Sequence, residues 1–353
     1  MVRLKKNSAL PKSTEGAPPR GSLRGTERVS LELGSGGKLM RDFIARRIVP
    51  AFRNPFLDDL GDASHLPLGI AFTTDSYVVD PVFFPGGDIG ALAVNGTVND
   101  LVVSGAIPQY ISLAMIIEEG LAWTDLDRIL KSIKRAAAGA EVRVACGDTK
   151  VVRRGQADKL YINTSGVGPT IARPQTSLIR PGDRIILTGT LGEHSMAVML
   201  AREEFGIEAR VRSDCAPLNF LLSIWEMGAL WMRDITRGGL ATILSELAEK
   251  IPHALLIDET KIPLSPAVRG ASELLGIDPL YLACEGRAVV VVPGKKADAI
   301  LKKIRQSPLG RRAAVIGQVD DRTGRPGELL LSTMTGGLRL LEPLTSELLP
   351  RIC

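Results

Sequence analysis

Carboxylate side chains recur where predicted strands end or where helices begin. Asp75 follows an apolar strand, Asp148 closes another strand, and Asp234 precedes a Gly-Gly turn. Asp88 opens a predicted helix, and Asp100 lies further along it. Taken singly, such carboxylates are usually helix caps or solvated strand ends. Taken together, with few cations nearby, they indicate the hard oxygen ligands that Mg²⁺ and a nucleoside triphosphate require.

The helix predicted over residues 86–108 carries polar side chains in one stripe. Asp88, Asn95 and Asn99 follow one another at i, i+7 and i+11, and a helical period places them on one side. The opposite side carries Ile89, Leu92, Ala93 and Leu101. The pattern therefore predicts a helix with one polar stripe, next to Asp100, and one apolar side.

The Gly-rich stretch GSGGK, residues 34–38, precedes a second predicted helix, which Pro50 is expected to end. A strict phosphate-binding loop is excluded because Leu39, and not Ser or Thr, follows Lys38. Leu39 also breaks the dinucleotide-binding fingerprint. Backbone N–H groups and a lysine ammonium before a helix can still cradle phosphate oxygens. A tight turn without a ligand remains the alternative for this loop.

Histidine and serine chemistry find no support in the motifs. The chain contains no H-E-x-x-H and no G-x-S-x-G sequence. His65, His194 and His253 are each expected to be incidental surface or packing residues.

The four cysteines lie far apart and form no CxxC pair, which argues against a zinc site and a disulfide framework. This usage favours a reducing cytoplasm. Cys146 and Cys284 stand beside apolar residues and are expected to be buried, and Cys215 is expected to be structural. Cys353 differs because it is the last residue and Arg351 supplies a nearby cation. It is the candidate reactive thiol.

The elements that must position these groups alternate between strands and helices, which supports two α/β or α+β domains. Strands are expected at 70–81, 110–117, 142–149, 159–168, 284–293 and 312–319. Helices are expected at 123–140, 234–250 and 297–306, and a strand–turn–helix unit is expected at 181–200.

Composition and charge exclude some classes of protein. The 353 residues are 45% hydrophobic, enough for a sizeable core, yet no apolar run reaches the length of a membrane span. The N-terminus lacks the apolar region of a secretory signal. Part of the net charge of +5 lies in residues 1–29, which are expected to form a flexible basic extension. A nucleic-acid-binding arm is the weaker alternative, because no aromatic residues are interleaved with its basic ones.

Several stretches taken together resemble the HypE-type hydrogenase maturation proteins. The stretches are GSGGKLMRDFI, FTTDSYVVDPVFFPGGDIGALAVNGTVNDLVVSGAIP, ACGDTKVV, DITRGGLATILSELA, ACEGR and the terminal PRIC. These proteins belong to the aminoimidazole-ribonucleotide synthetase-like superfamily, together with selenophosphate synthetase and thiamine-monophosphate kinase. The chain departs from the family at Leu33, where the family commonly has histidine.

The resemblance implies a carbamoyl dehydratase that uses ATP and Mg²⁺ and acts on its own C-terminus. A carbamoyltransferase of HypF type places a carboxamide on the Cys353 sulfur, and the enzyme converts it to an S-cyanide. An iron-scaffold complex of HypC–HypD type then receives the cyanide, which becomes a ligand of the [NiFe] hydrogenase centre. The implied assembly is a homodimer in the cytoplasm, with neither nucleic acid nor membrane as a partner.

The resemblance also implies roles for individual residues. Cys353 carries the substrate, Glu285 is the expected base, and Lys150 is a charge stabiliser or proton relay. Glu285 paired with Arg287 and a solvated Lys150 are the alternatives without a catalytic role. The expected Mg²⁺ ligands, which also belong to the ATP site, are Asp75, Asp100 and Asp234. The other residues expected around ATP are Gly36, Gly37, Lys38, Asp88, Asn99, Asp148, Thr149 and Gly238.

The implied architecture is an α/β (α+β) two-domain aminoimidazole-ribonucleotide synthetase-like fold with a flexible C-terminal tail. An ATP-binding and dimerisation domain is expected over 30–173, an α/β domain over 174–342, and a mobile tail ending in the reactive cysteine over 343–353. Two alternatives stay open: another ATP-using enzyme of the superfamily, or a non-catalytic docking scaffold. Selenophosphate synthetase would carry cysteine or selenocysteine before the loop lysine, where this chain has Gly37. Thiamine-monophosphate kinase has no use for a PRIC end.

Overall fold

The computed structural model describes residues 28–34, 36–57, 60–202, 210–321, 323–345 and 351–353. By its contacts the chain divides into Met1–Ser30 and Leu31–Cys353, and the elements described below lie in the second part. The extension predicted over 1–29 falls, except for its last two residues, outside the described residues.

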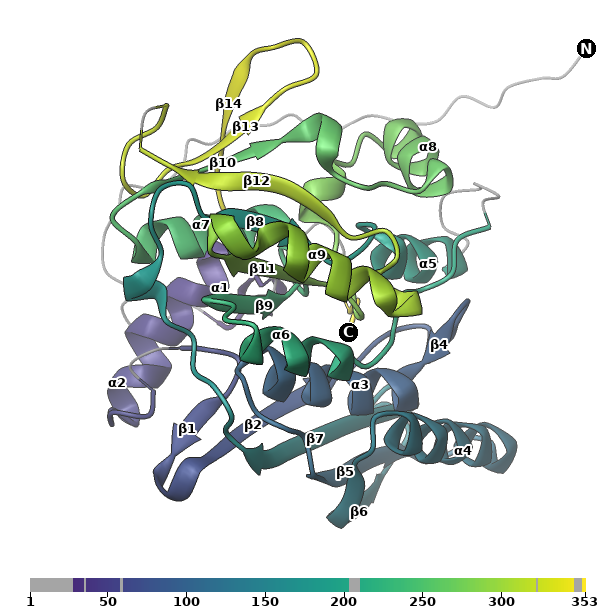
Figure 1. Cartoon of the computed structure of the whole chain (residues 1–353). Helices are drawn as coiled ribbons and strands as arrows, with labels where there is room; N and C mark the ends of the chain where they lie inside the picture. Colours follow the sequence, from purple (N-terminus) through teal and green to yellow (C-terminus); the bar gives the residue numbers. More distant parts are fainter. Residues whose placement is uncertain (1–27, 35, 58–59, 203–209, 322, 346–350) are drawn as a thin grey trace, which may run out of the picture. The chain divides into compact units, whose positions relative to one another are not determined.

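The first half of the fold is built on a five-stranded sheet with the order β1-β2-β7-β5-β6 (Figure 1). Its pairs are antiparallel except β5 with β6, which run parallel. The strands are β1 (Ser64–Leu66), β2 (Ile70–Tyr77), β5 (Tyr110–Glu118), β6 (Arg143–Val152) and β7 (Leu160–Pro169). Buried and less buried residues alternate along β7, as expected for a strand with one face on the core.

Helix α3 (Ile89–Val103) is the central element of the fold. It packs on β2 and β7 of the first sheet and on β9 of the second. Thirteen of its residues are buried, and most of them are small or β-branched. The side with Ile89, Leu92, Ala93 and Leu101 is buried, as the pattern predicts, and the polar stripe is covered as well, because Asn99 bonds to the second half. The other helices of this half are α1 (Lys38–Phe43), α2 (Val49–Ala51) and α4 (Trp123–Gly139).

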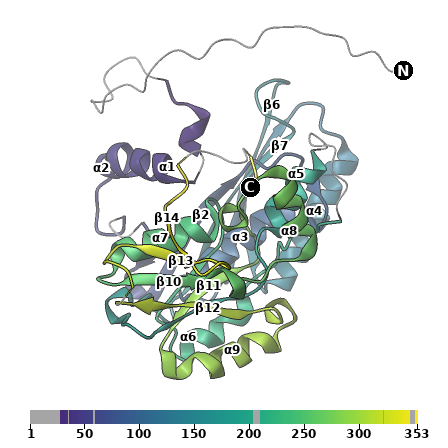
Figure 2. The same ribbon diagram turned by 90° about the horizontal axis from the view of Figure 1, so that it is seen from above.

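The second half contains a seven-stranded sheet with the order β14-β13-β10-β12-β8-β11-β9. Helix α9 packs on β8 and β12, whereas α7 packs on β10 and β13, so helices cover the sheet (Figure 2). The run of Val and Ala in β11 is buried along its whole length, as expected for a strand covered on both faces. The strands are β8 (Arg184–Leu187), β9 (Trp231–Asp234), β10 (Ala254–Asp258), β11 (Ala288–Val292), β12 (Ala314–Asp320), β13 (Leu329–Ser332) and β14 (Leu338–Leu341). The helices are α5 (Glu193–Ala201), α6 (Leu222–Glu226), α7 (Gly239–Lys250), α8 (Pro266–Leu275) and α9 (Ala297–Gln306).

Two short strands, β3 (Phe83–Phe84) and β4 (Gly87–Asp88), form a separate hairpin just before α3. The helix that follows the Gly-rich loop differs from its prediction, because Pro50 lies inside α2 and does not end the helix. A π-helical segment over Ile44–Ile48 joins α1 to α2. Among the described residues, no helix is long and apolar enough to cross a membrane.

The Asn99 side chain joins α3 to the second half of the chain. Its amide nitrogen donates to the carbonyl oxygens of Ala216 at 3.2 Å and Glu285 at 3.4 Å, and its oxygen accepts from the Leu218 N–H at 2.8 Å. The residue is 1% exposed. Loss of this side chain would leave buried main-chain groups without hydrogen-bond partners, and this lowers the free energy of unfolding.

We predict that Asn99→Ala lowers the free energy of unfolding by about 2 kcal/mol or more, because buried polar groups lose their partners. The shift in the urea midpoint at unchanged slope measures this. Asn54→Ala is the matched control, because Asn54 also bonds to backbone but is exposed. Equal midpoint shifts for the two variants would contradict the structural role of Asn99.

Candidate active site

A cavity of about 520 Å³ is lined by residues of both halves of the fold. This volume is typical of a small-molecule site. Seven of the residues predicted from the sequence meet on its walls: Gly36, Gly37, Asp75, Asp100, Asp234, Glu285 and Cys353. The cavity therefore joins the Gly-rich loop, the carboxylates and the C-terminal thiol, which are far apart in the sequence.

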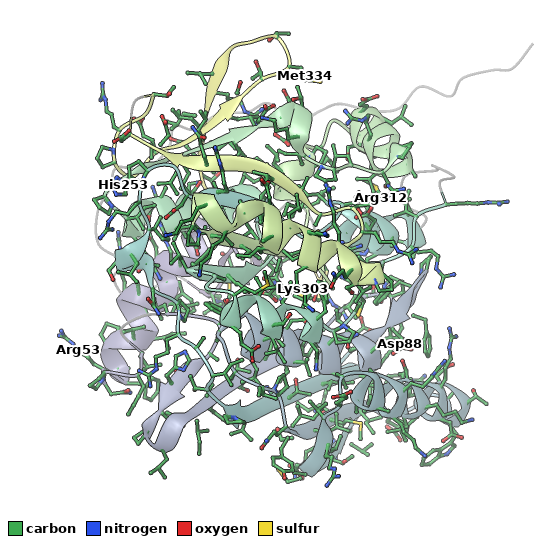
Figure 3. The ribbon with its side chains drawn as sticks, viewed as in Figure 1. Arg53, Asp88, His253, Lys303, Arg312 and Met334 are labelled. Carbon is green, nitrogen blue, oxygen red and sulfur yellow. The ribbon has the colours of Figure 1, made fainter. Side chains whose placement is uncertain are left out.

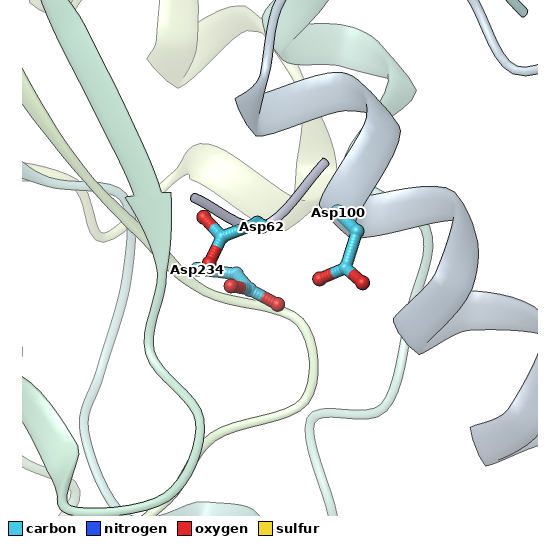
Figure 4. Close-up of side chains that lie close together, drawn as sticks. All are labelled: Asp62, Asp100 and Asp234. Carbon is cyan, nitrogen blue, oxygen red and sulfur yellow. The ribbon is translucent and has the colours of Figure 1, made fainter. Parts of the chain in front are cut away.

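Three carboxylates in this cavity form a compact cluster (Figure 4). Oxygen atoms of Asp62, Asp100 and Asp234 lie within 4.8 Å of one another. Asp100 belongs to α3, Asp234 ends β9, and Asp62 precedes β1. Sequence reasoning missed Asp62, although its place after Gly61 and just before a strand resembles the strand-end positions of the other carboxylates. Asp75 lines the same cavity but is outside this cluster.

Burial and mutual repulsion act on these carboxylates. Burial, followed by the charge of Asp234, raises the pKa of Asp100 well above its usual range. Burial, followed by the charge of Asp62, does the same to the pKa of Asp234. Asp75 is exposed to the cavity, yet desolvation by the protein around it raises its pKa. A divalent cation would relieve this repulsion, and the hard carboxylate oxygens suit Mg²⁺.

Arg233 holds part of the cluster in place. Its guanidinium lies 3.0 Å from Asp62 and 2.8 Å from Glu246. The Thr73 hydroxyl also donates to Asp100 at 2.8 Å. The carboxylates are thus oriented by neighbours on β9, α7 and β2.

The Cys353 side chain points into the cavity and is only 8% exposed. The Arg237 Nε–H group donates to its sulfur at 2.8 Å. Burial raises the pKa of the Cys353 thiol to about 12, although Arg237 opposes the shift. The cation beside the thiol is therefore Arg237, and the expectation that Arg351 supplies it is wrong. The Arg351 guanidinium pairs instead with Asp158.

Glu285 is a buried acid of the cavity with an incompletely hydrogen-bonded carboxyl group. It is 4% exposed, and its Oε1 atom has no hydrogen-bond partner among the described residues. Burial, with Asp234 and Asp75 next in effect, raises its pKa well above the usual range. Arg287 lies 3.6 Å from Asp214, so the alternative of a Glu285–Arg287 pair is not found. A carboxylate in such surroundings is a strong base once ionised.

The Gly-rich loop packs tightly against the segments that close the cavity. A side chain at Gly36, where φ is +74°, would meet Arg237, and one at Gly37 would meet the Leu344 carbonyl oxygen. The backbone N–H of Lys38 donates to that oxygen at 2.8 Å, and α1 therefore begins beside the chain that follows β14 (Figure 2). The Lys38 side chain is exposed. Small residues are therefore required at this loop even without a bound ligand.

Other predicted site residues lie away from the cavity walls. Asp148, Thr149 and Lys150 are on the exposed strand β6, where Lys150 Nζ lies 2.8 Å from Asp148. Asp88 caps α3 by accepting from the backbone of Gly90 and Ala91 (Figure 3). Gly238 is the N-cap of α7 and has a positive φ of 81°. The roles of these residues toward ATP, and that of Asn99, stay predictions.

Arg237 and His194 contact the C-terminal segment and were not predicted to do so. Arg237 follows Asp-Ile-Thr and precedes glycine, so the sequence alone could have indicated a cation next to the predicted carboxylate Asp234. His194 is fully buried, and its Nε2 lies 2.7 Å from the Ile352 carbonyl oxygen. His194 is thus a buried packing residue, as one of its expected roles had it, but its bond to Ile352 was not predicted.

The other cysteines are placed partly as expected. Cys284 is buried as predicted, and burial raises the pKa of its thiol. Burial likewise raises the pKa of the Cys215 thiol, in line with a structural role. Cys146 is exposed on β6, contrary to prediction, because that strand is at the sheet edge.

Comparison with known proteins gives strong matches over most of the chain. The AIR synthase related models match at residues 61–170 for the N-terminal domain and 180–326 for the C-terminal domain. The carbamoyl dehydratase HypE of Rhodobacter capsulatus is 44% identical over 337 residues, covering 93% of this chain and 98% of the relative. The solved HypE–HypF complex matches with a TM-score of 0.81 and 40% identity, covering 86% of this chain and 99% of that chain. The hydrogenase maturation protein HypE in complex with ATP matches with a TM-score of 0.77 and 43% identity, covering 92% and 100%.

These matches confirm the predicted α/β (α+β) two-domain aminoimidazole-ribonucleotide synthetase-like fold. The first matched region holds the whole five-stranded sheet and ends just after β7. The second begins just before β8 and ends before β13 and β14 of the seven-stranded sheet.

We predict that Asp100→Asn raises the melting temperature of the metal-free protein at pH 8 by about 2–4 °C, because it removes a buried, repelled charge. The penalty is present above the raised folded-state pKa and is relieved as pH falls through it toward the unfolded value of about 4. The gain should therefore shrink at lower pH. Mg²⁺ should raise the melting temperature of the natural protein and have little effect on the variant.

Asp127→Asn is the matched control, because Asp127 is exposed on α4. It should change neither the metal-free melting temperature nor the response to Mg²⁺. If Mg²⁺ stabilises the Asp100→Asn variant as strongly as the natural protein, the cluster is not the cation site.

Proposed function

This chain belongs to the HypE family of carbamoyl dehydratases, which are hydrogenase maturation proteins, and from that premise we propose that it dehydrates a carboxamide on its own Cys353 sulfur to a cyanide with ATP. The observation that carries the proposal is the presence of the C-terminal sulfur in the same cavity as Glu285 and the carboxylates. The substrate is thus part of the chain, and the last residue delivers it.

The residues around the sulfur suit this reaction. When bound, Mg²⁺–ATP supplies the phosphoryl group that makes the carboxamide oxygen a leaving group. The carboxamide nitrogen would lose one proton when the oxygen is phosphorylated, and the second as the carbon–oxygen bond breaks, the triple bond forms and phosphate leaves. The proton that Glu285 does not accept would pass to the departing phosphate or to solvent. Glu285 is the proposed base that accepts a nitrogen proton. Arg237 orients the sulfur by donating its Nε–H to it.

Mg²⁺ is expected at Asp62, Asp100 and Asp234, with Asp75 beside them. The fit rests on the close approach of these three carboxylates and on the raised pKa values of Asp100 and Asp234, for which burial is the largest cause. ATP is expected between this cluster and the Gly-rich loop at Gly36 and Gly37. The HypE structure solved in complex with ATP, 43% identical to this chain, supports ATP as the nucleotide, and the place of ATP in this cavity is part of the proposal.

The proposed partners follow the proposed reaction. A HypF-type carbamoyltransferase donates the carboxamide, in line with the solved HypE–HypF complex of a relative. A HypC–HypD-type iron scaffold receives the cyanide. Because Cys353 is buried in this conformation, its sulfur must leave the cavity to meet either partner. The proposed location is the cytoplasm.

We predict that incubation with the carbamoyltransferase, carbamoyl phosphate and ATP first adds a carboxamide to Cys353 and then removes one water. Intact-protein mass spectrometry follows both steps. Cys353→Ala should accept no carboxamide, because it has no sulfur. Asp75→Ala should accept the carboxamide and keep it, because only the ATP-dependent step is damaged.

Two results would contradict the proposal. One is a Cys353→Ala variant that still gains and dehydrates the adduct. The other is a natural protein that keeps the carboxamide in the presence of Mg²⁺ and ATP, which would favour a docking scaffold. A folded Asp75→Ala variant that loses both steps would mean that Asp75 serves partner docking.

We further propose a homodimer through the first sheet, in which β6 of one copy approaches the second copy. Strand β6 is at the edge of that sheet and is exposed along almost its whole length. Val151 is 69% exposed, and Val144 and Ile116 are 45% and 43% exposed. In one chain, β7 and β5 separate Asp75 on β2 from Lys150 on β6, which amounts to about 14 Å at the usual strand spacing. Lys150 would therefore serve the cavity of the second copy.

We predict that Val151→Asp converts the dimer to a monomer, because it places a charge in the apolar contact. Size-exclusion chromatography with light scattering measures the mass. Leu274→Asp is the matched control, since Leu274 is 75% exposed on α8, and it should remain a dimer. The Val151→Asp monomer should accept the carboxamide but lose water slowly. A natural protein that is already monomeric would refute the dimer.

A further inference from the structure

The C-terminal segment, residues 351–353, is held by hydrogen bonds to the main-chain oxygen of each of its three residues. The Val78 N–H donates to the Cys353 carbonyl oxygen at 3.1 Å, and the Asp80 N–H donates to that of Arg351 at 3.2 Å. Arg202 also donates to the Arg351 oxygen, at 2.9 Å. The first two bonds come from the segment that follows β2, the third comes from the end of α5, and none of them involves the sulfur.

The Ile352 carbonyl, between those two, is held by His194. Its oxygen lies 2.7 Å from Nε2 of the imidazole. A carbonyl oxygen can only accept, so Nε2 carries the hydrogen, and Nδ1 must accept from the Ser213 hydroxyl at 2.8 Å. The Ser213 oxygen in turn accepts from the Cys215 N–H at 3.1 Å. This chain of bonds selects one neutral tautomer of His194.

The surroundings keep the imidazole in one orientation. His194 is fully buried on α5, and the Phe84 ring meets it edge-on at a centroid distance of 5.3 Å. Asp214 also acts on it electrostatically, whereas burial lowers its pKa and favours the neutral ring. The ring is therefore a fixed donor aimed at one carbonyl.

We propose that His194 is a positioning residue for the dehydration step, because it fixes the register of the C-terminal segment by holding the carbonyl next to Cys353. The contact is to the backbone, so thiol, carboxamide and cyanide forms all dock in the same register. A slip of one residue would move the sulfur by about 3.3 Å and turn it to the other side of the segment. It would then leave Arg237 and Glu285, and misplacement of about 1 Å can already cost about a hundredfold in rate.

The test uses the full-length protein and two substitutions of one residue. His194→Phe keeps a ring but removes the donor, whereas His194→Gln keeps an N–H at a similar reach. Two rates are measured by mass spectrometry: alkylation of Cys353 by iodoacetamide, with the exposed Cys146 as internal reference, and water loss from the carbamoylated protein. Only the second rate depends on the proposed function, so the first still decides the role of His194 if no dehydration occurs.

We expect His194→Phe to speed Cys353 alkylation about tenfold and to slow water loss about tenfold or more, because a buried carbonyl loses its donor. Carboxamide transfer to Cys353 should be unchanged, because the sulfur accepts it outside the cavity. His194→Gln should bring both rates most of the way back to those of the natural protein. His253→Phe, on the loop after α7, is the matched control and should change neither rate (Figure 3).

The proposal is overturned if folded His194→Phe leaves both rates within twofold of the natural protein. Slower water loss with unchanged alkylation also overturns it, because His194 would then act on something other than docking. If His194→Phe does not fold, Ser213→Ala replaces it. That variant removes the partner that selects the tautomer and should shift both rates threefold to tenfold in the same directions, and no shift overturns the proposal.

Discussion

The carboxylates of Asp62, Asp100 and Asp234 repel one another, and the fold holds them together from three separate segments of the chain. Burial, followed by the neighbouring negative charges, raises the pKa of Asp100 and that of Asp234, so the fold holds these carboxylates close together at a cost. Side chains in such a position need rigid support. Arg233 and the buried helix α3 provide it, and the packing of both sheets on α3 follows from the same requirement.

The C-terminal segment depends on the same junction. The last residues reach the cavity where three parts of the fold bind them. Val78, just after β2, and Arg237, just before α7, bond to Cys353, and His194 on α5 bonds to Ile352. The main-chain oxygens of Arg351, Ile352 and Cys353 all accept hydrogen bonds, whereas the sulfur accepts one from Arg237. This separates the recognition of the segment from the chemistry on its sulfur. A substrate that changes its chemical state while it stays attached to the enzyme needs such a separation.

Burial of the thiol has a second consequence. A free cysteine at a chain end is prone to oxidation when it is a thiolate and exposed to solvent. In the docked conformation, burial raises the pKa of Cys353 to about 12 and keeps the thiol protonated. The docked conformation therefore protects the group that the reaction needs, and reactivity toward a partner requires that the segment leave the cavity.

The sequence by itself determined the fold class, most strands and helices, and seven of the residues that meet in the cavity. It did so because strand-end carboxylates, glycine loops and the terminal PRIC are local patterns with a strong resemblance to one family. Only the tertiary structure decided that α3 is buried on all sides, that Asp62 joins the cluster, and that Arg237 and His194 hold the C-terminal residues. These features depend on contacts between segments far apart in the chain, such as His194 with Ile352, and no local pattern of residue types encodes which distant carbonyl a buried imidazole will meet.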